Sequence, residues 1–153
     1  MEALNELEPK VPIVISVQDL QALDRTDVVI ADVRWYLDGR DGRKAYTEGH
    51  IPGAIFVDLD RDLASSDRSD ATHGRHPFPT PSAFAGAMSR LGIGSDSHVV
   101  AYDDTGGMTA SRLVVMLRML GCKASVLDGG IHAWQRANDQ PLASGKPTTV
   151  KAA

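Results

Sequence analysis

The sequence has one cysteine, few aromatic residues and no long apolar run. With Cys122 as its single cysteine, it excludes an internal disulfide and a zinc site built from several thiolates. No stretch of about 18 apolar residues is present, so the sequence predicts no membrane-spanning helix. Its first residues lack the basic-then-apolar layout of a secretory signal. We therefore expect a cytoplasmic protein without a membrane partner.

The charges are nearly balanced and dispersed along the chain. There are 16 Lys and Arg against 20 Asp and Glu, for a net charge of −4, and no basic block occurs. This pattern argues against a nucleic-acid partner. A chain of 153 residues that is 42% hydrophobic has the length and composition of one globular domain with a substantial core.

Short apolar runs alternate with helical patterns. The predicted strands cover residues 12–16, 27–33, 54–59, 98–103 and 125–128. The predicted helices cover residues 17–23, about one turn at 44–48, 81–91, 109–120 and the segment after Gly130. Strands that alternate with helices favour parallel pairing and right-handed crossovers. The sequence therefore predicts an α/β fold of three layers, with a parallel five-stranded sheet flanked by helices.

Two helix starts carry recognisable caps. Ser16 precedes the first helical pattern, and Asp19 lies near the positive end of that helix. Thr80 and Pro81 give the second start, a cap followed by proline in the first turn.

Two segments lack hydrophobic periodicity. Residues 61–79 are rich in Ser, Asp, Gly and Pro, as expected of a long surface loop that is functional or mobile. After residue 141 the chain becomes polar and rich in small residues. We predict one domain over residues 1–141 and a linker over residues 142–153, which leads toward a second domain outside this chain.

The stretch "VVAYDDTGGMTASRLV", residues 99–114, joins a strand to a helix through a polar turn that contains glycine. The backbone amides of such a turn, together with the helix amino end, make a cradle for anions. The residue directly after the strand is Asp103.

Two separated motifs carry a family resemblance. "GHIPGA" at residues 49–54 and "VLDGGIHAW" at residues 126–134 stand in the order typical of a rhodanese domain, and the likeness runs from Ile15 to Trp134. The sequence resembles in particular the amino-terminal half of the two-domain thiosulfate and 3-mercaptopyruvate sulfurtransferases. A resemblance of this kind predicts the fold more firmly than the activity, because function depends on the site.

In that family, the resemblance implies, a cysteine after the fourth strand carries sulfur as a persulfide inside the ring of loop amides. Here the position is Asp103, and a carboxylate cannot form a persulfide. The loop is also about one residue longer than the active version, and we expect this to disrupt the ring of amides. We predict no catalytic residue, cofactor or metal in this chain. The degenerate loop comprises Asp103, Asp104, Thr105, Gly106, Gly107, Met108 and Thr109.

The resemblance also implies a partner, a second rhodanese domain that closes a cleft over a small sulfur donor. His76 stands where 3-mercaptopyruvate-type relatives present a histidine, and Asp60 matches its acidic partner. An imidazole held by a carboxylate can relay a proton, and Arg75 can attract an anionic donor. The competing interpretation is that His76 and Arg75 are solvated loop residues and that Asp60 caps a helical turn.

Other marked residues are assigned to the scaffold. His50 is expected to shape a turn, and Asp32 to pair with His50 or a nearby arginine. Arg112 either completes an anion site or forms a salt bridge. Cys122 precedes its strand, whereas ligand sites in parallel sheets lie at the carboxyl ends, so it is expected to be a small packing residue.

Two rival functions follow from the same residues. One is a stand-alone inactive rhodanese-like module that binds or regulates. The other is a phosphatase of related fold, which also needs a loop cysteine and is therefore excluded by Asp103. The tail after residue 141 favours half of a two-domain sulfurtransferase over the stand-alone module.

Overall fold

The computed structural model describes residues 11–138 and 141–146. The strands are β1 (Val14–Ile15), β2 (Val28–Asp32), β3 (Ile55–Phe56), β4 (His98–Tyr102) and β5 (Lys123–Leu127). The helices are α1 (Val17–Ala22), α2 (Gly42–Glu48), α3 (Leu59–Asp62), α4 (Pro81–Arg90), α5 (Ala110–Met119) and α6 (Gly130–Asn138), with short 3-10 turns at Arg25–Asp27 and Ala71–His73.

The five strands form one parallel sheet in the order β1-β5-β4-β2-β3, which confirms the predicted fold class. In the central pair, Val28 lies opposite His98 and Asp32 opposite Tyr102. Because all strands run the same way, the loops that leave them gather along one edge of the sheet. Asp103 and the segment after Asp32 therefore lie at the same edge.

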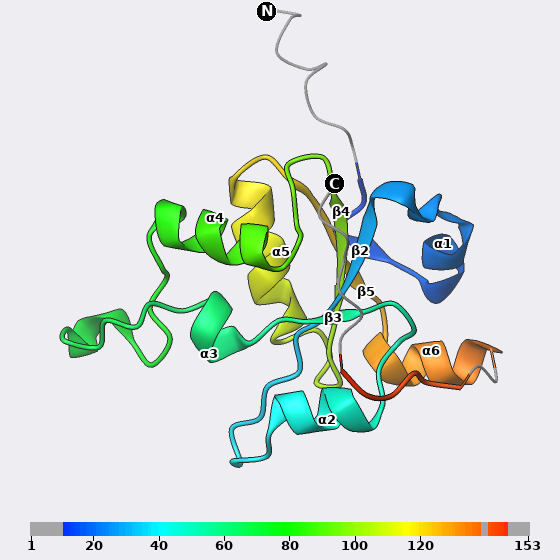
Figure 1. Ribbon diagram of the computed structural model, residues 1–153, viewed down its shortest axis with the longest axis horizontal. Coiled ribbons are helices and arrows are strands. Elements are labelled where there is room, and N and C mark those ends of the chain that lie inside the picture. The colour runs from blue at the N-terminus through cyan, green and yellow to red at the C-terminus, as the bar shows by residue number, and fades with distance from the viewer. Residues whose placement is uncertain (1–10, 139–140, 147–153) are drawn as a thin grey trace, which may run out of the picture.

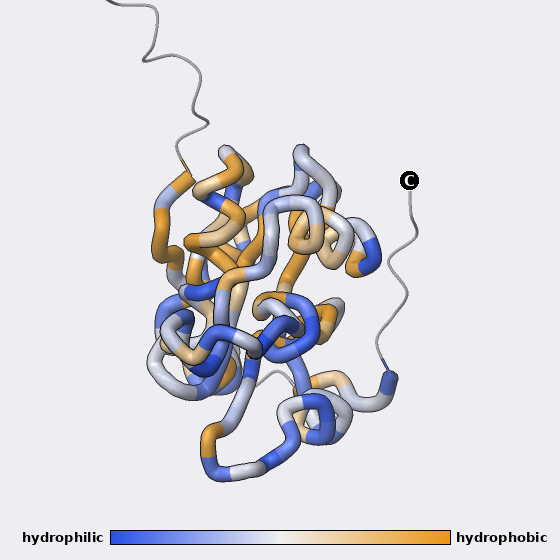
Figure 2. Tube along the Cα trace, turned by 90° about the vertical axis from the view of Figure 1, so that its left-hand side faces the viewer, coloured by the Kyte–Doolittle hydropathy of each residue, from blue (hydrophilic) through white to orange (hydrophobic). Residues whose placement is uncertain are grey.

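Helices cover both faces of the sheet (Figure 1). On one face, Phe84 of α4 and Leu113 of α5 belong to a buried cluster with residues of β2, β4 and β5. On the other face, Leu20 of α1, Tyr46 of α2 and Trp134 of α6 belong to a second cluster. Figure 2 shows the result as hydrophobic segments in the interior and hydrophilic ones along many outer loops. Burial on both faces explains why the central strands read as continuous apolar runs.

The predicted caps are confirmed. Ser16 and Asp19 form a reciprocal capping box, in which each side chain accepts the backbone N–H of the other at 3.0 Å. Thr80 accepts the N–H of Ala83 at 3.2 Å and starts α4. Asp41 caps α2 in the same way, so this helix begins at Gly42, two residues before the predicted turn.

The long surface loop predicted over residues 61–79 is only partly exposed. Its first residues complete α3, and Leu63 and Ala64 are buried against the core. The remainder, from Ser65 to the start of α4, is mostly exposed. Hydrophobic periodicity did not reveal the buried part because α3 is a single four-residue turn.

Part of the predicted linker contacts the domain. Ala143 pairs with His50 through two backbone hydrogen bonds of 2.9 Å, and Leu142 packs near the second hydrophobic cluster. Residues 147–153 lie outside the described part of the chain, and the division at residue 141 stays a prediction. Across the described ranges, none of the helices has the length and apolar character needed to cross a membrane.

Candidate functional site

Five hydrogen bonds converge on the carboxylate of Asp103, directly after β4. Oδ1 accepts the backbone N–H groups of Thr105 and Gly107 at 2.9 and 2.8 Å. Oδ2 accepts the N–H groups of Thr109 and Ala110, both at 2.9 Å, and the Thr109 hydroxyl at 3.1 Å. Asp103 is 1% exposed. The loop is folded around its own side chain.

The electrostatics of this carboxylate follow from its donors. Burial alone would raise the pKa of Asp103, because it disfavours the charged form. The hydrogen bonds from Ala110, Thr105, Gly107 and Thr109 outweigh burial, and the pKa lies below the ordinary value of 3.8. The cradle therefore holds an internal anion at neutral pH.

The expectation that the longer loop loses its ring of amides is wrong. Within this loop, Gly106 and Gly107 adopt φ angles of 73° and 87°. Such angles are accessible to glycine at little cost and bend the chain back so that its N–H groups point inward. The ring is present, and the side chain of Asp103 fills it.

The turn between β5 and α6 closes over the same loop. The backbone N–H of Ile131 donates to the carbonyl oxygen of Asp103 at 3.1 Å. A Cβ at Gly130, where φ is 58°, would lie 2.1 Å from that oxygen. Glycine is therefore required at this position by both the angle and the close approach.

Three consecutive residues after β2 each bind a different aspartate. Arg34 forms a buried salt bridge of 2.7 Å with Asp32 and also donates to the carbonyl of Gly49 at 2.7 Å. This confirms the predicted pairing of Asp32 with an arginine. The arginine bond fixes the start of the segment that carries the next two residues.

The side chains of Trp35 and Tyr36, the next two residues, bind aspartates in two different loops. The Trp35 indole N–H donates to Asp60 Oδ2 at 2.8 Å, and the Tyr36 hydroxyl donates to Asp104 Oδ2 at 2.7 Å. Burial and the neighbouring Asp104 raise the pKa of Tyr36 to about 12, so it remains a hydrogen-bond donor. Sequence reasoning missed both aromatic residues, because an aromatic side chain after a strand is ordinarily assigned to packing.

The predicted pair of Asp60 and His76 is in contact. Asp60 Oδ1 lies 2.9 Å from His76 Nε2, and the side chains are 55% and 18% exposed. Trp35 meets the imidazole edge to face, with the ring centroids 4.9 Å apart. The backbone N–H of Asp60 is itself capped by Asp58 at 3.0 Å. The structure therefore brings together a carboxylate, an imidazole and an indole at the carboxyl edge of the sheet.

Of the two predicted roles of Arg112, the salt bridge is absent from the described part of the chain, and the role in an anion site stays a prediction. Its guanidinium donates to the carbonyl oxygens of Leu63 and His76, with the Nη2 distance 2.8 Å in each case. It also lies over the ring of Phe78, with Cζ 4.6 Å from the centroid. The side chain anchors the backbone that carries His76. These carbonyls bind Nε and Nη2 and hold the guanidinium in place without a carboxylate partner.

Arg75 stays on the surface. It is exposed, and its Cζ lies 5.9 Å from the centroid of the Trp35 ring. The guanidinium adds positive charge beside the Asp60–His76 pair, and its role toward a donor stays a prediction.

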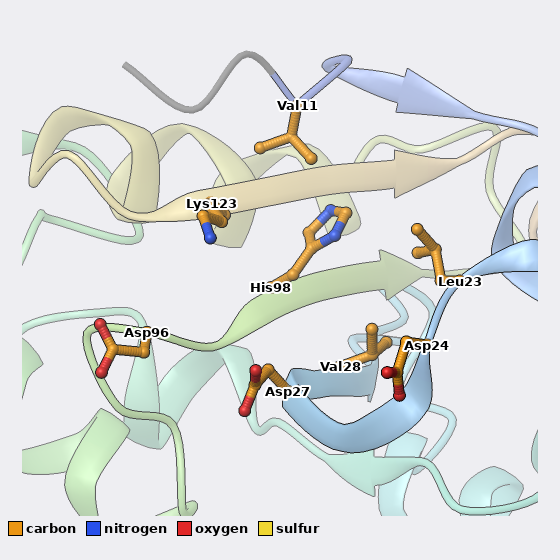
Figure 3. Close-up of a pocket in the computed structure, with 8 residues that line it drawn as sticks. All are labelled: Val11, Leu23, Asp24, Asp27, Val28, Asp96, His98 and Lys123. Carbon is orange, nitrogen blue, oxygen red and sulfur yellow. The ribbon is translucent and has the colours of Figure 1, made fainter. Parts of the chain in front are cut away.

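A pocket of about 330 Å³ lies at the opposite edge of the sheet, away from these loops (Figure 3). Its lining includes His98 and Lys123, from neighbouring strands. His98 Nε2 lies 2.9 Å from the hydroxyl of Ser125, which in turn donates to the carbonyl of Pro12. Ligand sites of parallel sheets form at the other edge, and the Ser125 bond at this edge holds the segment before β1.

The sequence of the described fold matches a known family. Residues 16–137 match the rhodanese-like domain. The chain belongs to this family. The 3-mercaptopyruvate sulfurtransferase of Homo sapiens is 44% identical over 122 residues, which make up 76% of this chain and 39% of that protein.

Solved structures agree with the rhodanese assignment. The 3-mercaptopyruvate sulfurtransferase from Leishmania major superposes with a TM-score of 0.82 at 29% identity, over 93% of this chain and 39% of that one. SseA from Escherichia coli, described as a 3-mercaptopyruvate sulfotransferase, gives 0.76 at 33% identity, over 89% of this chain and 52% of that one. The chain thus spans about half or less of each of these relatives.

The rhodanese motif at residues 49–54 belongs to the scaffold, as predicted. His50 is buried, its Nδ1 lies 2.8 Å from the carbonyl of Tyr46, and the two rings stack with centroids 3.9 Å apart. Ile51 donates its backbone N–H to the Tyr102 hydroxyl at 3.1 Å. Cys122, half-buried against the first hydrophobic cluster at the amino end of β5, is confirmed as a packing residue.

Proposed function

We propose that this rhodanese domain is the non-catalytic amino-terminal half of a thiosulfate or 3-mercaptopyruvate sulfurtransferase, and that it supports sulfane-sulfur transfer by a cysteine in a second domain. One observation carries the proposal. The carboxylate of Asp103 stands where the family's nucleophile is expected, and it uses the amide donors of the loop itself.

The chemistry of this arrangement opposes sulfur transfer by the domain alone. The reaction needs a polarisable thiolate as nucleophile. Asp103 offers charged oxygens one bond beyond Cγ, as the terminal sulfur of a cysteine persulfide lies one bond beyond Sγ. The carboxylate thus resembles the loaded state of the loop. An incoming thiosulfate meets a like charge and amides that are already bonded.

The contribution we propose for this domain is the Asp60–His76 pair. When a thiolate takes the sulfur of 3-mercaptopyruvate, the carbon–sulfur bond breaks and the electron pair stays on carbon as an enolate. That carbon then takes up a proton, which a positioned imidazole can supply or relay. Thiosulfate departs as sulfite, which needs no such proton at neutral pH.

Apolar side chains at the same edge support a docking role. Met108 on the loop after β4 is 65% exposed, and Phe78 beside Arg112 is 64% exposed. Leu37, after β2, is exposed as well. Interdomain contacts typically bury about 600 to 1,500 Å². These side chains fit a surface that the second domain covers.

Two observations test the assignment. The native reading frame downstream of residue 153 is expected to encode a second rhodanese-like domain with a cysteine after its fourth strand.

In the two-domain protein, His76→Ala should slow turnover with 3-mercaptopyruvate by about 100-fold, within the usual range for an acid–base group, and should affect thiosulfate much less. Equal loss with both donors would assign His76 to docking, and no loss with either would remove it from the site.

The docking surface is tested with matched methionines. Met108→Glu should abolish binding of this chain to the separately expressed second domain, measured by calorimetry. Met119→Glu is the control, because Met119 is 76% exposed on α5, away from the loop edge. Failure of the unmodified chain to bind the second domain would favour the alternative, a stand-alone inactive rhodanese-like module.

A further inference from the structure

We propose that Trp35 is the positioning residue of the Asp60–His76 pair, and that it fixes His76 with its proton on Nε2 and with Nδ1 as the nitrogen offered to the reaction. The catalytic consequence rests on the proposed function. The positioning itself can be tested in this chain alone, so the two can fail separately.

The Asp60 carboxylate is shared between two partners. Oδ2 accepts the indole N–H of Trp35 at 2.8 Å, and Oδ1 lies 2.9 Å from His76 Nε2. Asp60 lies in α3, a four-residue helix, and its side chain is 55% exposed. A carboxylate that is more than half exposed on one turn of helix gains little packing to select its rotamer. The indole bond supplies that selection.

The indole of Trp35 is itself held in place by its neighbours. Trp35 directly follows Arg34, whose guanidinium is bonded to Asp32 and to the carbonyl of Gly49. The indole also meets the His76 ring at an interplanar angle of 87°. A constraint therefore runs from the end of β2 through Trp35 to Asp60 and on to the imidazole.

The hydrogen bond to Asp60 decides which ring nitrogen of His76 carries the proton. An ionised carboxylate only accepts hydrogen bonds, so the bond between Asp60 and His76 places the proton on Nε2. Neutral imidazole then has a lone pair on Nδ1, which forms no hydrogen bond with residues 11–138 or 141–146. The backbone of His76 is held by Arg112 at 2.8 Å. Both the position of the ring and the identity of its available nitrogen are thereby fixed.

The test is nuclear magnetic resonance of the isolated chain in alkaline solution, where imidazoles are neutral. In the unmodified chain we expect a His76 Hε2 signal whose exchange with water is slowed by the bond to Asp60. Trp35→Phe keeps an aromatic ring against the imidazole but removes the N–H. We expect Hε2 exchange in this variant to be about 10-fold faster, as for loss of one hydrogen bond worth about 1.4 kcal/mol.

Tyr36→Phe is the matched control. It also removes one donor from an aspartate, but that aspartate is Asp104, so His76 exchange should not change. Unchanged Hε2 exchange in Trp35→Phe, or a proton found on Nδ1 in the unmodified chain, would overturn the proposal.

A second variant covers the case in which Trp35→Phe fails to fold. Asp60→Ala should shift the Trp35 indole N–H signal and make its exchange with water about 10-fold faster, since the same bond is broken from the other side. An unchanged indole signal would contradict the proposal.

Turnover in the two-domain protein separates this inference from the proposed function. Trp35→Phe should lower kcat with 3-mercaptopyruvate by about 10-fold, the tenfold expected for about 1.4 kcal/mol, and should leave KM nearly unchanged. A loss of activity in His76→Ala without one in Trp35→Phe contradicts the positioning role. Normal activity in His76→Ala contradicts the proposed function and leaves the exchange measurements to decide on Trp35.

Discussion

At the scale of single residues, Asp103 explains both what the loop retains and what it lacks. Four backbone amides of the loop surround the carboxylate of Asp103, and under the proposed function they are the donors that a persulfide would need. Their number decides the balance, because together they outweigh the cost of burying the charge and keep the pKa of Asp103 low. The loop thus has donors for an anion, and the side chain of Asp103 itself occupies them.

A cysteine at this position should therefore meet a preformed cradle. In Asp103→Cys, with Cys122→Ala to remove the other thiol, we expect a thiol pKa below about 7, against about 8.5 for an ordinary cysteine. The pH dependence of alkylation by iodoacetamide measures it. A pKa near 8.5 would mean that the amides converge only when a carboxylate is present.

Removing the charge should destabilise the fold. Asp103→Asn keeps the shape but places an NH₂ group among donors, so we expect the free energy of unfolding to fall by about 2 kcal/mol at pH 7. The pKa of Asp103 is lowered in the folded chain, so the stabilisation that its carboxylate provides is complete above pH 3.8. This stabilisation is lost as the pH falls below 3.8 and through the pKa of the folded state. Urea unfolding should show that the difference in free energy of unfolding between the unmodified chain and Asp103→Asn becomes smaller below about pH 4. A difference that persists in acid would contradict the electrostatic explanation.

At the scale of elements, the site depends on loops held by long side chains. Arg112, at the start of α5, binds the carbonyls of Leu63 and His76 and so fixes both ends of the exposed segment between them. The segment after β2 is held by Arg34, which binds Asp32 and the carbonyl of Gly49. The regular elements supply the edge of the sheet, and these side chains arrange the loops along it.

Replacing this anchor should free the segment. Arg112→Ala removes the donors of at least two carbonyls, and we expect the free energy of unfolding to fall by about 2 kcal/mol. Trypsin should then cleave faster at Arg68 and Arg75, which lie in the exposed segment. Arg112→Lys keeps a single ammonium group, so its cleavage rate should lie between those of the unmodified chain and Arg112→Ala. Cleavage at the native rate in Arg112→Ala would show that other contacts hold the segment.

The amino end of β4 should give the fold a dependence on pH. Burial and the charges of Lys123 and Arg118 lower the pKa of His98 below 6.5, although Asp27 and Asp96 line the same pocket. The unfolded chain therefore binds the proton more readily, and the stabilisation present above pH 6.5 is lost as the pH falls. Thermal unfolding between pH 7.5 and 5 should show this loss, and His98→Asn should weaken the dependence. An identical dependence in the variant would assign it to other groups.

At the scale of the whole molecule, the sequence predicts the layers better than the site. Apolar runs identify the five strands, and cap residues such as Ser16 and Thr80 locate helix starts within one residue. The Asp60–His76 pair was predicted from the family resemblance. The ring around Asp103 was not, because loop length says nothing of how Gly106 and Gly107 bend the backbone.

Sulfur transfer by this chain alone measures directly whether Asp103 leaves the domain without a nucleophile. Thiosulfate:cyanide transfer and turnover of 3-mercaptopyruvate should both stay at background for the 153-residue chain and for its Cys122→Ala variant, because a carboxylate occupies the place of the nucleophile. The variant has no thiol left to carry the sulfur, so turnover above background that survives Cys122→Ala would contradict the proposal that sulfur transfer needs a cysteine in a second domain.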